Sequence, residues 1–165
     1  MSREVIHGSI QYRRSVVAGF AYATLAAGLR PSAAQPLPKI VVTKDPSCGC
    51  CSGWIDHLRA SGFKAEVIES PEVNRLKVRL GVPQDLASCH TAEIGGYVIE
   101  GHVPAQAINR LLAERPSAKG LAVPGMPVGS PGMEVEGAAP ETYEVVLFGE
   151  GKRTTFAHYQ GGRAI

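Results

Sequence analysis

Three cysteines lie within four residues, in Cys48-Gly49-Cys50-Cys51, between a predicted strand and a predicted helix. The strand covers residues 40–44, an apolar and β-branched run that Asp45-Pro46-Ser47 ends. The helix covers residues 51–61, because apolar side chains recur there at helical spacing and Gly62 follows as a stop signal. A cysteine turn between a first strand and a first helix constrains the fold more than any other feature of the chain.

The pattern beyond the cysteines continues to alternate between strand and helix. The predicted strands are 63–69 and 95–102, and the predicted helices are 72–80 and 104–114. A Gly/Pro/Met loop at 121–133, with no strand or helix period, precedes a β-hairpin of strands 143–148 and 153–157. Strands alternating with helices predict a mixed sheet with helices on its faces. With the cysteine turn, this order favours a thioredoxin-like α/β fold.

Residues 1–34 have the pattern of an export signal. Arg13 and Arg14 precede an apolar run without charge at 15–29, and Ser32-Ala33-Ala34 provides the small residues of a cleavage site. The paired arginines resemble a twin-arginine signal, and a Sec signal remains an alternative. A membrane anchor is disfavoured because the run is shorter than the roughly 20 residues that span a bilayer. We therefore expect a periplasmic domain at residues 35–165, with membrane contact only through the uncleaved signal.

The charge of the predicted domain excludes one class of partner. Four of the 17 basic and one of the 15 acidic side chains lie in residues 1–34, so the remainder has a net charge near −1. No basic face is left to indicate nucleic-acid binding.

The spacing of the four cysteines argues against a purely structural role. In an exported protein the default interpretation is two structural disulfides. Three cysteines in four residues fit that default poorly, because disulfide geometry disfavours adjacent cysteines and a domain of about 130 residues does not need such links. A site that keeps thiolates close together explains the clustering better.

Cys48 and Cys51 form a C-x-x-C at a helix N-terminus, where free amides and the helix dipole favour the thiolate. That is the arrangement of a thiol-disulfide redox protein. A third thiol at Cys50 interferes with a two-thiol switch, whereas a metal cluster can use it. In a thioredoxin-like fold Cys89, just before a strand, approaches the cysteine turn and brings His90 with it. The alternative for Cys89 is a small buried hydrophobe.

Thiolates, thioethers and imidazoles together select soft metals, with Cu(I) first and Zn(II) second. Met126 and Met133 lie in the Gly/Pro/Met loop, as candidate ligands or as side chains that fill gaps. His102 lies at the end of a predicted strand, and a ligand and an ordinary loop histidine are both open interpretations. Zinc is disfavoured because a closed zinc site would ask for a second C-x-x-C.

Four motifs, in order, resemble those of the CopG-type periplasmic copper-resistance proteins, which are often labelled only as predicted metal-binding proteins. The motifs are Cys48-Gly49-Cys50-Cys51 with Trp54, Ser88-Cys89-His90-Thr91-Ala92, the segment 96–104, and the segment 120–134 with its two Pro-Gly-Met steps. The resemblance implies a thioredoxin-like domain whose four cysteines bridge more than one copper ion. The ligands or neighbouring groups that it implies are Cys48, Cys50, Cys51, Cys89, His90, His102, Met126 and Met133.

The leading expectation is an exported copper-binding protein that holds Cu(I) as a multi-copper thiolate cluster in copper resistance or homeostasis. Its expected partners are copper ions and other envelope proteins that handle copper. The alternatives are a thiol-disulfide oxidoreductase that uses Cys48 and Cys51 and a small domain with inert disulfides. The resemblance also implies a redox contribution, such as a change in copper oxidation state, so enzymatic activity is left open and no catalytic residue is assigned.

Overall fold

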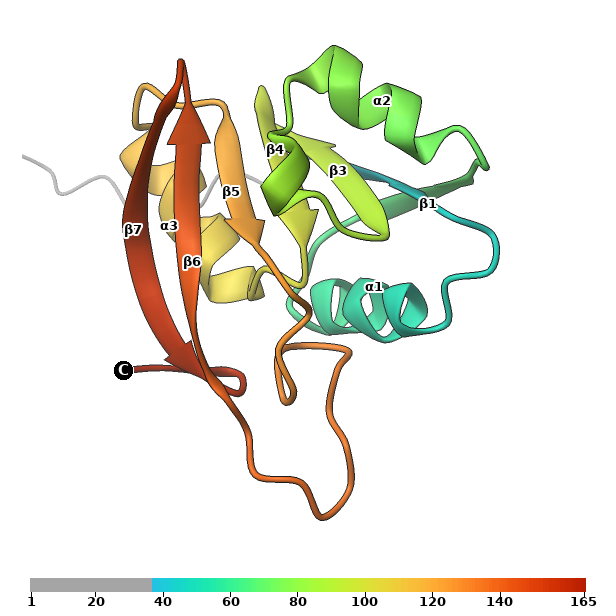
Figure 1. Ribbon diagram of the computed structural model, residues 1–165, viewed down its shortest axis with the longest axis vertical. Helices are drawn as coiled ribbons and strands as arrows, with labels where there is room; N and C mark the ends of the chain where they lie inside the picture. The colour runs from blue at the N-terminus through green and yellow to red at the C-terminus, as the bar shows by residue number, and fades with distance from the viewer. Residues whose placement is uncertain (1–36) are drawn as a thin grey trace, which may run out of the picture. The chain divides into compact units, whose positions relative to one another are not determined.

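The computed structural model describes residues 37–165, so the predicted signal peptide at 1–34 lies outside the described residues. Figure 1 shows the arrangement of the elements. The helices are α1 (Cys50–Ala60), α2 (Val73–Leu80), the 3-10 helix η1 (Gln84–Leu86) and α3 (Ala105–Glu114). The strands are β1 (Ile40–Lys44), β2 (Ala65–Glu69), β3 (His90–Ile94), β4 (Tyr97–Gly101), β5 (Gly120–Val123), β6 (Thr142–Gly149), β7 (Lys152–Gln160) and β8 (Arg163–Ala164). None of the helices in residues 37–165 combines the length and apolar character that a bilayer span requires.

The strands form one mixed sheet in the order β2-β1-β3-β4-β5-β6-β7-β8. Two parallel pairs, β1 with β2 and β4 with β5, are connected through α1 and α3. β3 lies between the two pairs and runs antiparallel to both β1 and β4. Its register places His90 opposite Lys44, so the start of β3 lies beside the end of β1, from which the cysteine turn departs.

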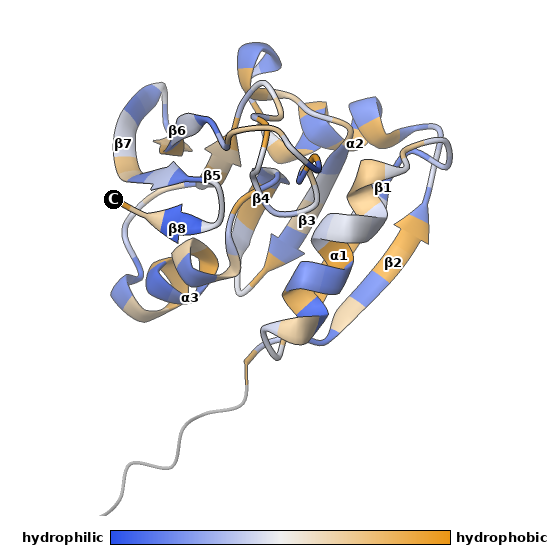
Figure 2. Ribbon diagram, turned by 90° about the horizontal axis from the view of Figure 1, so that it is seen from below, coloured by the Kyte–Doolittle hydropathy of each residue, from blue (hydrophilic) through white to orange (hydrophobic). Residues whose placement is uncertain are grey.

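Two apolar layers stabilise the sheet, one on each face. α1 and α3 cover one face, while α2 lies on the other (Figures 1 and 2). Successive residues of a strand point to opposite faces, so Ile99 belongs to the layer under α1 and α3 and Val98 to the opposite layer. Trp54, Leu58, Ile108 and Leu111 are fully buried in the first layer. α1 and α3 are therefore packed firmly against this face of the sheet.

The predicted mixed α/β fold with a C-terminal β-hairpin is confirmed, and the thioredoxin-like assignment stays a prediction. The hairpin turn is Glu150-Gly151, and both residues have positive φ, as a tight two-residue hairpin turn requires. The prediction that Pro104 is the first residue of its helix is wrong, because Pro104 has an extended backbone and α3 begins at Ala105.

The prediction missed three strands, β3, β5 and β8. β3 contains His90 and Thr91, polar residues that are fully buried because side-chain hydrogen bonds satisfy them. β5 has four residues, Gly120–Val123. The prediction of a loop at 121–133 is therefore wrong for residues 121–123, which belong to this strand. A Cβ atom at Gly120 would lie 1.7 Å from the carbonyl oxygen of Val98, so this glycine marks a close approach of two strands.

Candidate metal centre

The cysteine turn begins where Asp45 ends β1. The Asp45 carboxylate accepts hydrogen bonds from the Ser47 amide and hydroxyl, and the Cys48 amide donates to the Asp45 carbonyl over 3.1 Å. The bond from the Ser47 hydroxyl is the main cause that lowers the pKa of Asp45. α1 begins at Cys50 without a side-chain cap, and the Ser52 amide of its first turn donates to the Gly49 carbonyl over 3.2 Å. The positive end of the helix dipole therefore faces the nearby sulfurs and favours negative charge on them.

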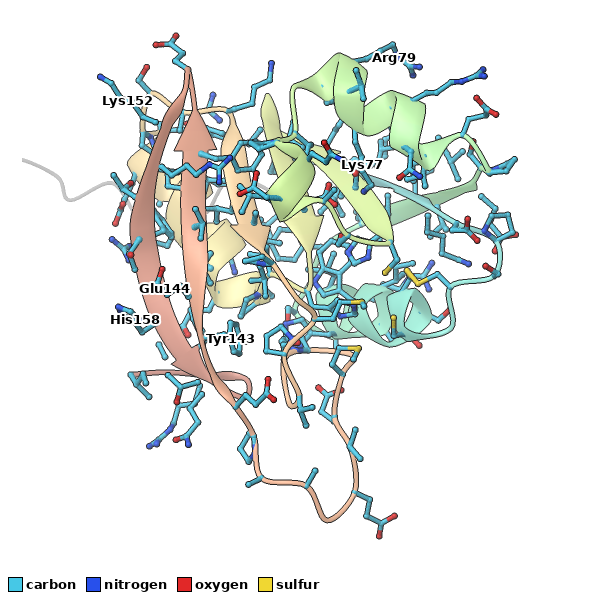
Figure 3. All side chains as sticks on the ribbon, viewed as in Figure 1. Lys77, Arg79, Tyr143, Glu144, Lys152 and His158 are labelled. Carbon is cyan, nitrogen blue, oxygen red and sulfur yellow. A yellow bond between two sulfur atoms is a disulfide. The ribbon has the colours of Figure 1, made fainter. Side chains whose placement is uncertain are left out.

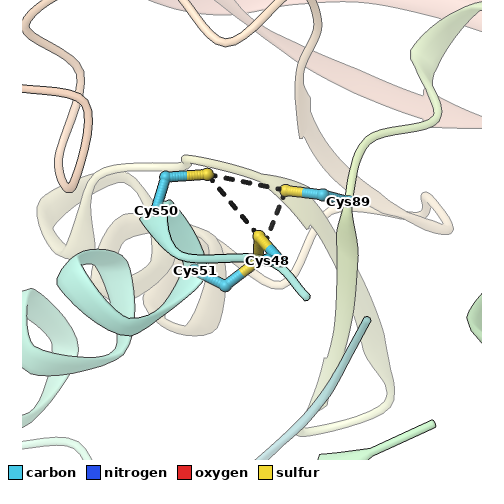
Figure 4. A group of neighbouring side chains, drawn as sticks. All are labelled: Cys48, Cys50, Cys51 and Cys89. Atoms are coloured by element: carbon cyan, nitrogen blue, oxygen red, sulfur yellow. Dashed lines mark hydrogen bonds between the residues drawn. A yellow bond between two sulfur atoms is a disulfide. The ribbon is translucent and has the colours of Figure 1, made fainter. Parts of the chain in front are cut away.

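Four sulfur atoms meet at this turn (Figure 4). Cys48 and Cys51 form a disulfide, while Cys50 and Cys89 are free thiols. The Cys50 sulfur lies 3.5 Å from that of Cys48 and 3.9 Å from that of Cys89, and the sulfurs of Cys51 and Cys89 are 3.3 Å apart. All four lie within 4.8 Å of one another. The fold therefore brings Cys89 to the cysteine turn across a large separation in sequence.

A buried polar network holds the residues on both sides of Cys89. The Lys77 ammonium donates to the His90 carbonyl over 2.8 Å, to the Thr91 hydroxyl over 2.6 Å and to Glu100 over 2.7 Å. Glu100 also accepts the Ser88 amide and hydroxyl. Figure 3 labels Lys77 on α2, above the sulfur atoms at the start of α1.

Burial and the neighbouring Cys50 thiol raise the pKa of Cys89 to about 11.

Two fully buried histidines lie behind Cys89. One ring nitrogen of His90 donates to the Gly101 carbonyl over 3.0 Å, and its Nδ1 lies 3.7 Å from the Cys89 sulfur. His102 Nδ1 donates to the Pro131 carbonyl over 2.7 Å, whereas its Nε2 is buried without a hydrogen-bond partner. A carbonyl only accepts, so the opposite nitrogen of each neutral ring presents a lone pair.

The ligand atoms of these two histidines and of Cys89 also lie within 4.8 Å of one another. Burial lowers the pKa of His90 to about 3, and it lowers the pKa of His102 as well. Both rings are therefore neutral near pH 7, the form in which imidazole binds a metal. The unpartnered Nε2 of His102 fits a metal ligand, because a buried polar atom without a partner is unfavourable unless it has a function.

The two loop methionines differ in their position relative to the cysteines. The Met126 sulfur lies 3.9 Å from the Cys89 sulfur, and its side chain is partly exposed. Met133 is half-buried and its backbone closes the loop, through bonds to Ser130 and Gly129. In the part of the chain that the structure describes, no hydrogen-bonding contact joins the Met133 sulfur to the cysteines. The loop therefore brings Met126 to the sulfur group more closely than Met133.

The sulfur group is open to solvent on one side. A surface pocket of about 340 Å³ is lined by Cys48, Cys50, Cys89 and Met126, with Asp45 and Ser47 at its polar side. An ion could thus reach the sulfurs from solvent, while the two histidines lie beneath them.

The sequence analysis missed several residues that support the site. Trp54 packs against His90 in a tilted arrangement, with ring centroids 4.3 Å apart, and its indole nitrogen donates to the Val103 carbonyl over 2.9 Å. The sequence pattern shows Trp54 only as part of a motif. The Lys77–Glu100 pair was not singled out, although a glutamate inside the apolar strand Tyr97–Gly101 was a usable signal. His57 lies apart from the site, where its Nε2 accepts the Ala105 amide at the start of α3.

Comparisons with known proteins agree with the motifs. The chain is 47% identical to two solved structures titled "Copper resistance protein copG", Form 1 and Form 2, each with a TM-score of 0.71. The alignments cover 77% and 76% of this chain and 100% and 99% of those chains. A family model described as "Protein of unknown function, DUF411" matches residues 86–133, and the curated proteins contain no match. With that identity over the whole length of both relatives, this chain belongs to the CopG copper-resistance protein family.

Proposed function

We propose that this protein is an exported copper-binding protein that holds Cu(I) as a multi-copper thiolate cluster in copper resistance or homeostasis. The observation that carries the proposal is the convergence of four cysteine sulfurs from two segments within 4.8 Å. Thiolate, thioether and neutral imidazole donors are the set that Cu(I) prefers. The titles of the related structures, which name copper resistance, support the choice of copper.

The number of donors favours more than one ion. The four cysteines, Met126 and the free nitrogens of His90 and His102 outnumber the four donors of a single tetrahedral ion. Cys89 belongs to both groups of candidate ligands, the all-sulfur group and the group with the histidines. A thiolate shared in this way would bridge neighbouring copper ions. Met133 stays a candidate ligand, and a movement of its loop would have to bring its sulfur to the cysteines.

The Cys48–Cys51 disulfide links copper binding to thiol redox state. A disulfide sulfur is not a thiolate ligand, so full loading requires that two electrons and two protons convert the disulfide into two thiols. Cys50 and Cys89 are free in either state and could keep one ion. The same disulfide, in a C-x-x-C at a helix N-terminus, favours thiol-disulfide oxidoreductase activity as the second candidate function.

Copper titration of the reduced full-length protein tests the leading proposal. Under anaerobic conditions, with a chromogenic Cu(I) chelator as competitor, we expect more than one Cu(I) per chain. Cys89→Ser should lower that number, because it removes the sulfur shared by both groups. His158→Asn, an exposed position on β7, is the matched control and should leave the number unchanged. A count of zero for the unmodified protein would overturn the proposal.

The second candidate predicts different behaviour. An oxidoreductase would turn over a disulfide substrate, would need Cys48 and Cys51, and would tolerate the loss of Met126 and Met133. Copper binding without such turnover would leave only the first function.

Export is the remaining part of the proposal. We expect the protein in the periplasmic fraction with residues 1–34 removed, where other envelope copper-handling proteins could exchange copper with it. Replacement of Arg13 and Arg14 by lysine should stop export if the signal is of the twin-arginine type and leave it intact if the signal is of the Sec type.

A further inference from the structure

Gly53 occupies an exposed position inside α1 where alanine would form a better helix. The reason lies outside the helix. A Cβ atom at Gly53 would stand 3.0 Å from the Cα atom of Gly132, well inside the 3.5–4.0 Å at which carbon atoms normally pack. Residue 53 therefore lacks a side chain at the point where the segment around Gly132 occupies the space.

Gly132 makes the same contact from the other side. A Cβ atom there would lie 2.4 Å from the Trp54 amide nitrogen and 3.0 Å from the Cys50 carbonyl oxygen. Its φ of +83° is in the left-handed region that favours glycine. The backbone of the methionine loop, which we define as residues 124–133, thus lies directly on the turn of α1 that carries Cys50 and Cys51.

The methionine loop is internally braced, so a displacement at Gly132 would be passed along it. Ser130 is fully buried and donates through its hydroxyl to the Pro127 carbonyl over 2.7 Å. The Met133 amide donates to the Ser130 carbonyl over 2.7 Å. Between these bonds, the Pro131 carbonyl accepts the His102 Nδ1 proton. The loop therefore connects the Gly132 contact to the ring orientation of His102 and, at its other end, to Met126.

We propose that Gly53 and Gly132 are positioning residues of the copper site. Their contact, free of side chains, seats the methionine loop on α1 so that the Met126 sulfur and the His102 Nε2 reach copper held by the cysteines. The inference rests on the proposed function. It goes beyond that function because the two glycines have no side-chain donor atom and act only by positioning the ligands.

Gly53→Ala tests the contact with a single methyl group. The backbone of Gly53 is already helical, so alanine suits the helix itself and only the loop has to move, by about 0.5–1 Å. Gly162→Ala is the matched control, because a Cβ atom there meets nothing within 4 Å. The full-length reduced proteins, labelled with ¹³C at the methionine methyl groups, are titrated with Cu(I) against a competing chelator.

We expect Gly53→Ala to weaken Cu(I) binding roughly tenfold to a hundredfold, the range that loss of outer support for metal ligands produces. The Met126 methyl signal, assigned with Met126→Leu, should shift on copper addition in the unmodified protein and in Gly162→Ala but not in Gly53→Ala. Combined with Met126→Leu, Gly53→Ala should cost less affinity than it does alone, because its effect passes partly through that sulfur.

Two results would overturn the positioning role. One is a Gly53→Ala protein with unchanged copper affinity and an unchanged Met126 shift. The other is a full additional loss in the Met126→Leu background. If Gly53→Ala does not fold, Gly132→Ala introduces the clash from the loop side and is judged by the same measurements. Failure of the unmodified protein to bind copper would instead refute the proposed function itself, so the two failures are distinguishable.

Discussion

Lys77→Met should strongly destabilise the protein, because it removes one partner of a buried ion pair. The Lys77 and Glu100 side chains are 3% and 0% exposed, with 2.7 Å between nitrogen and oxygen. Leaving one charge of such a pair without its partner typically costs about 3–5 kcal/mol. Glu100 would keep the Ser88 amide and hydroxyl and the Thr91 hydroxyl as donors, so we expect the lower end, about 3 kcal/mol.

Urea denaturation of the reduced protein measures this loss. With a denaturant slope of about 1–3 kcal/mol/M, the unfolding midpoint should fall by about 1–3 M. Lys39→Met is the matched control, because the Lys39–Glu66 pair is more than half exposed and should contribute below about 1 kcal/mol. The double variant Lys77→Met/Glu100→Gln should recover part of the loss, since it leaves no unpaired buried charge. A Lys77→Met loss no larger than that of Lys39→Met would refute this reasoning.

Three further predictions concern pH, the loop and the metal. Burial lowers the pKa of His57, so the stability that its neutral ring gives through the Ala105 amide is complete above about pH 6.5. It is lost as the pH falls below that value, and His57→Gln should flatten this part of a plot of unfolding free energy against pH. Met126→Leu should weaken Cu(I) binding in chelator competition more than Met133→Leu, because the Met126 sulfur lies 3.9 Å from that of Cys89 and, among residues 37–165, no such sulfur contact joins Met133 to the cysteines; equal effects would contradict the geometry. Copper at about a thousand times its dissociation constant should stabilise the reduced protein by about 4 kcal/mol, seen as a higher melting temperature that a strong chelator reverses.

The local pattern of the chain was enough for the elements that depend on local rules. β1, α1, α3 and the β6–β7 hairpin follow from apolar spacing and from glycine at turns, and each was predicted close to its observed bounds. β3 and β5 were missed because their residues become strands only through pairing. Thr91 is polar but buried with Lys77 and Glu100, and Gly120 is needed because the Val98 backbone approaches it too closely for a side chain. Such partners are distant in sequence and leave no local period.

Some candidate ligands could likewise be identified from local sequence, whereas others depend on contacts between distant segments. The C-x-C-C turn at a helix start could be read as a metal or redox motif from the sequence, because spacing within four residues decides which sulfurs can meet. Cys89 was inferred through an assumed fold and through the family resemblance, because its spacing from the turn decides nothing. What brings it there is the antiparallel pairing of β3 with β1, in which His90 lies opposite Lys44.

The kind of donor atom is readable from the sequence. Its clustered cysteines, His90, His102 and two loop methionines carry soft-metal donor atoms wherever the chain places them, because donor preference belongs to the atoms. Which of these donors meet, and in what protonation state, depends on the folded chain. Burial makes His102 neutral and leaves its Nε2 without a partner, and the fold places the Met126 sulfur 3.9 Å from that of Cys89. These properties arise from solvent exclusion and from packing between distant segments, which a linear pattern does not contain.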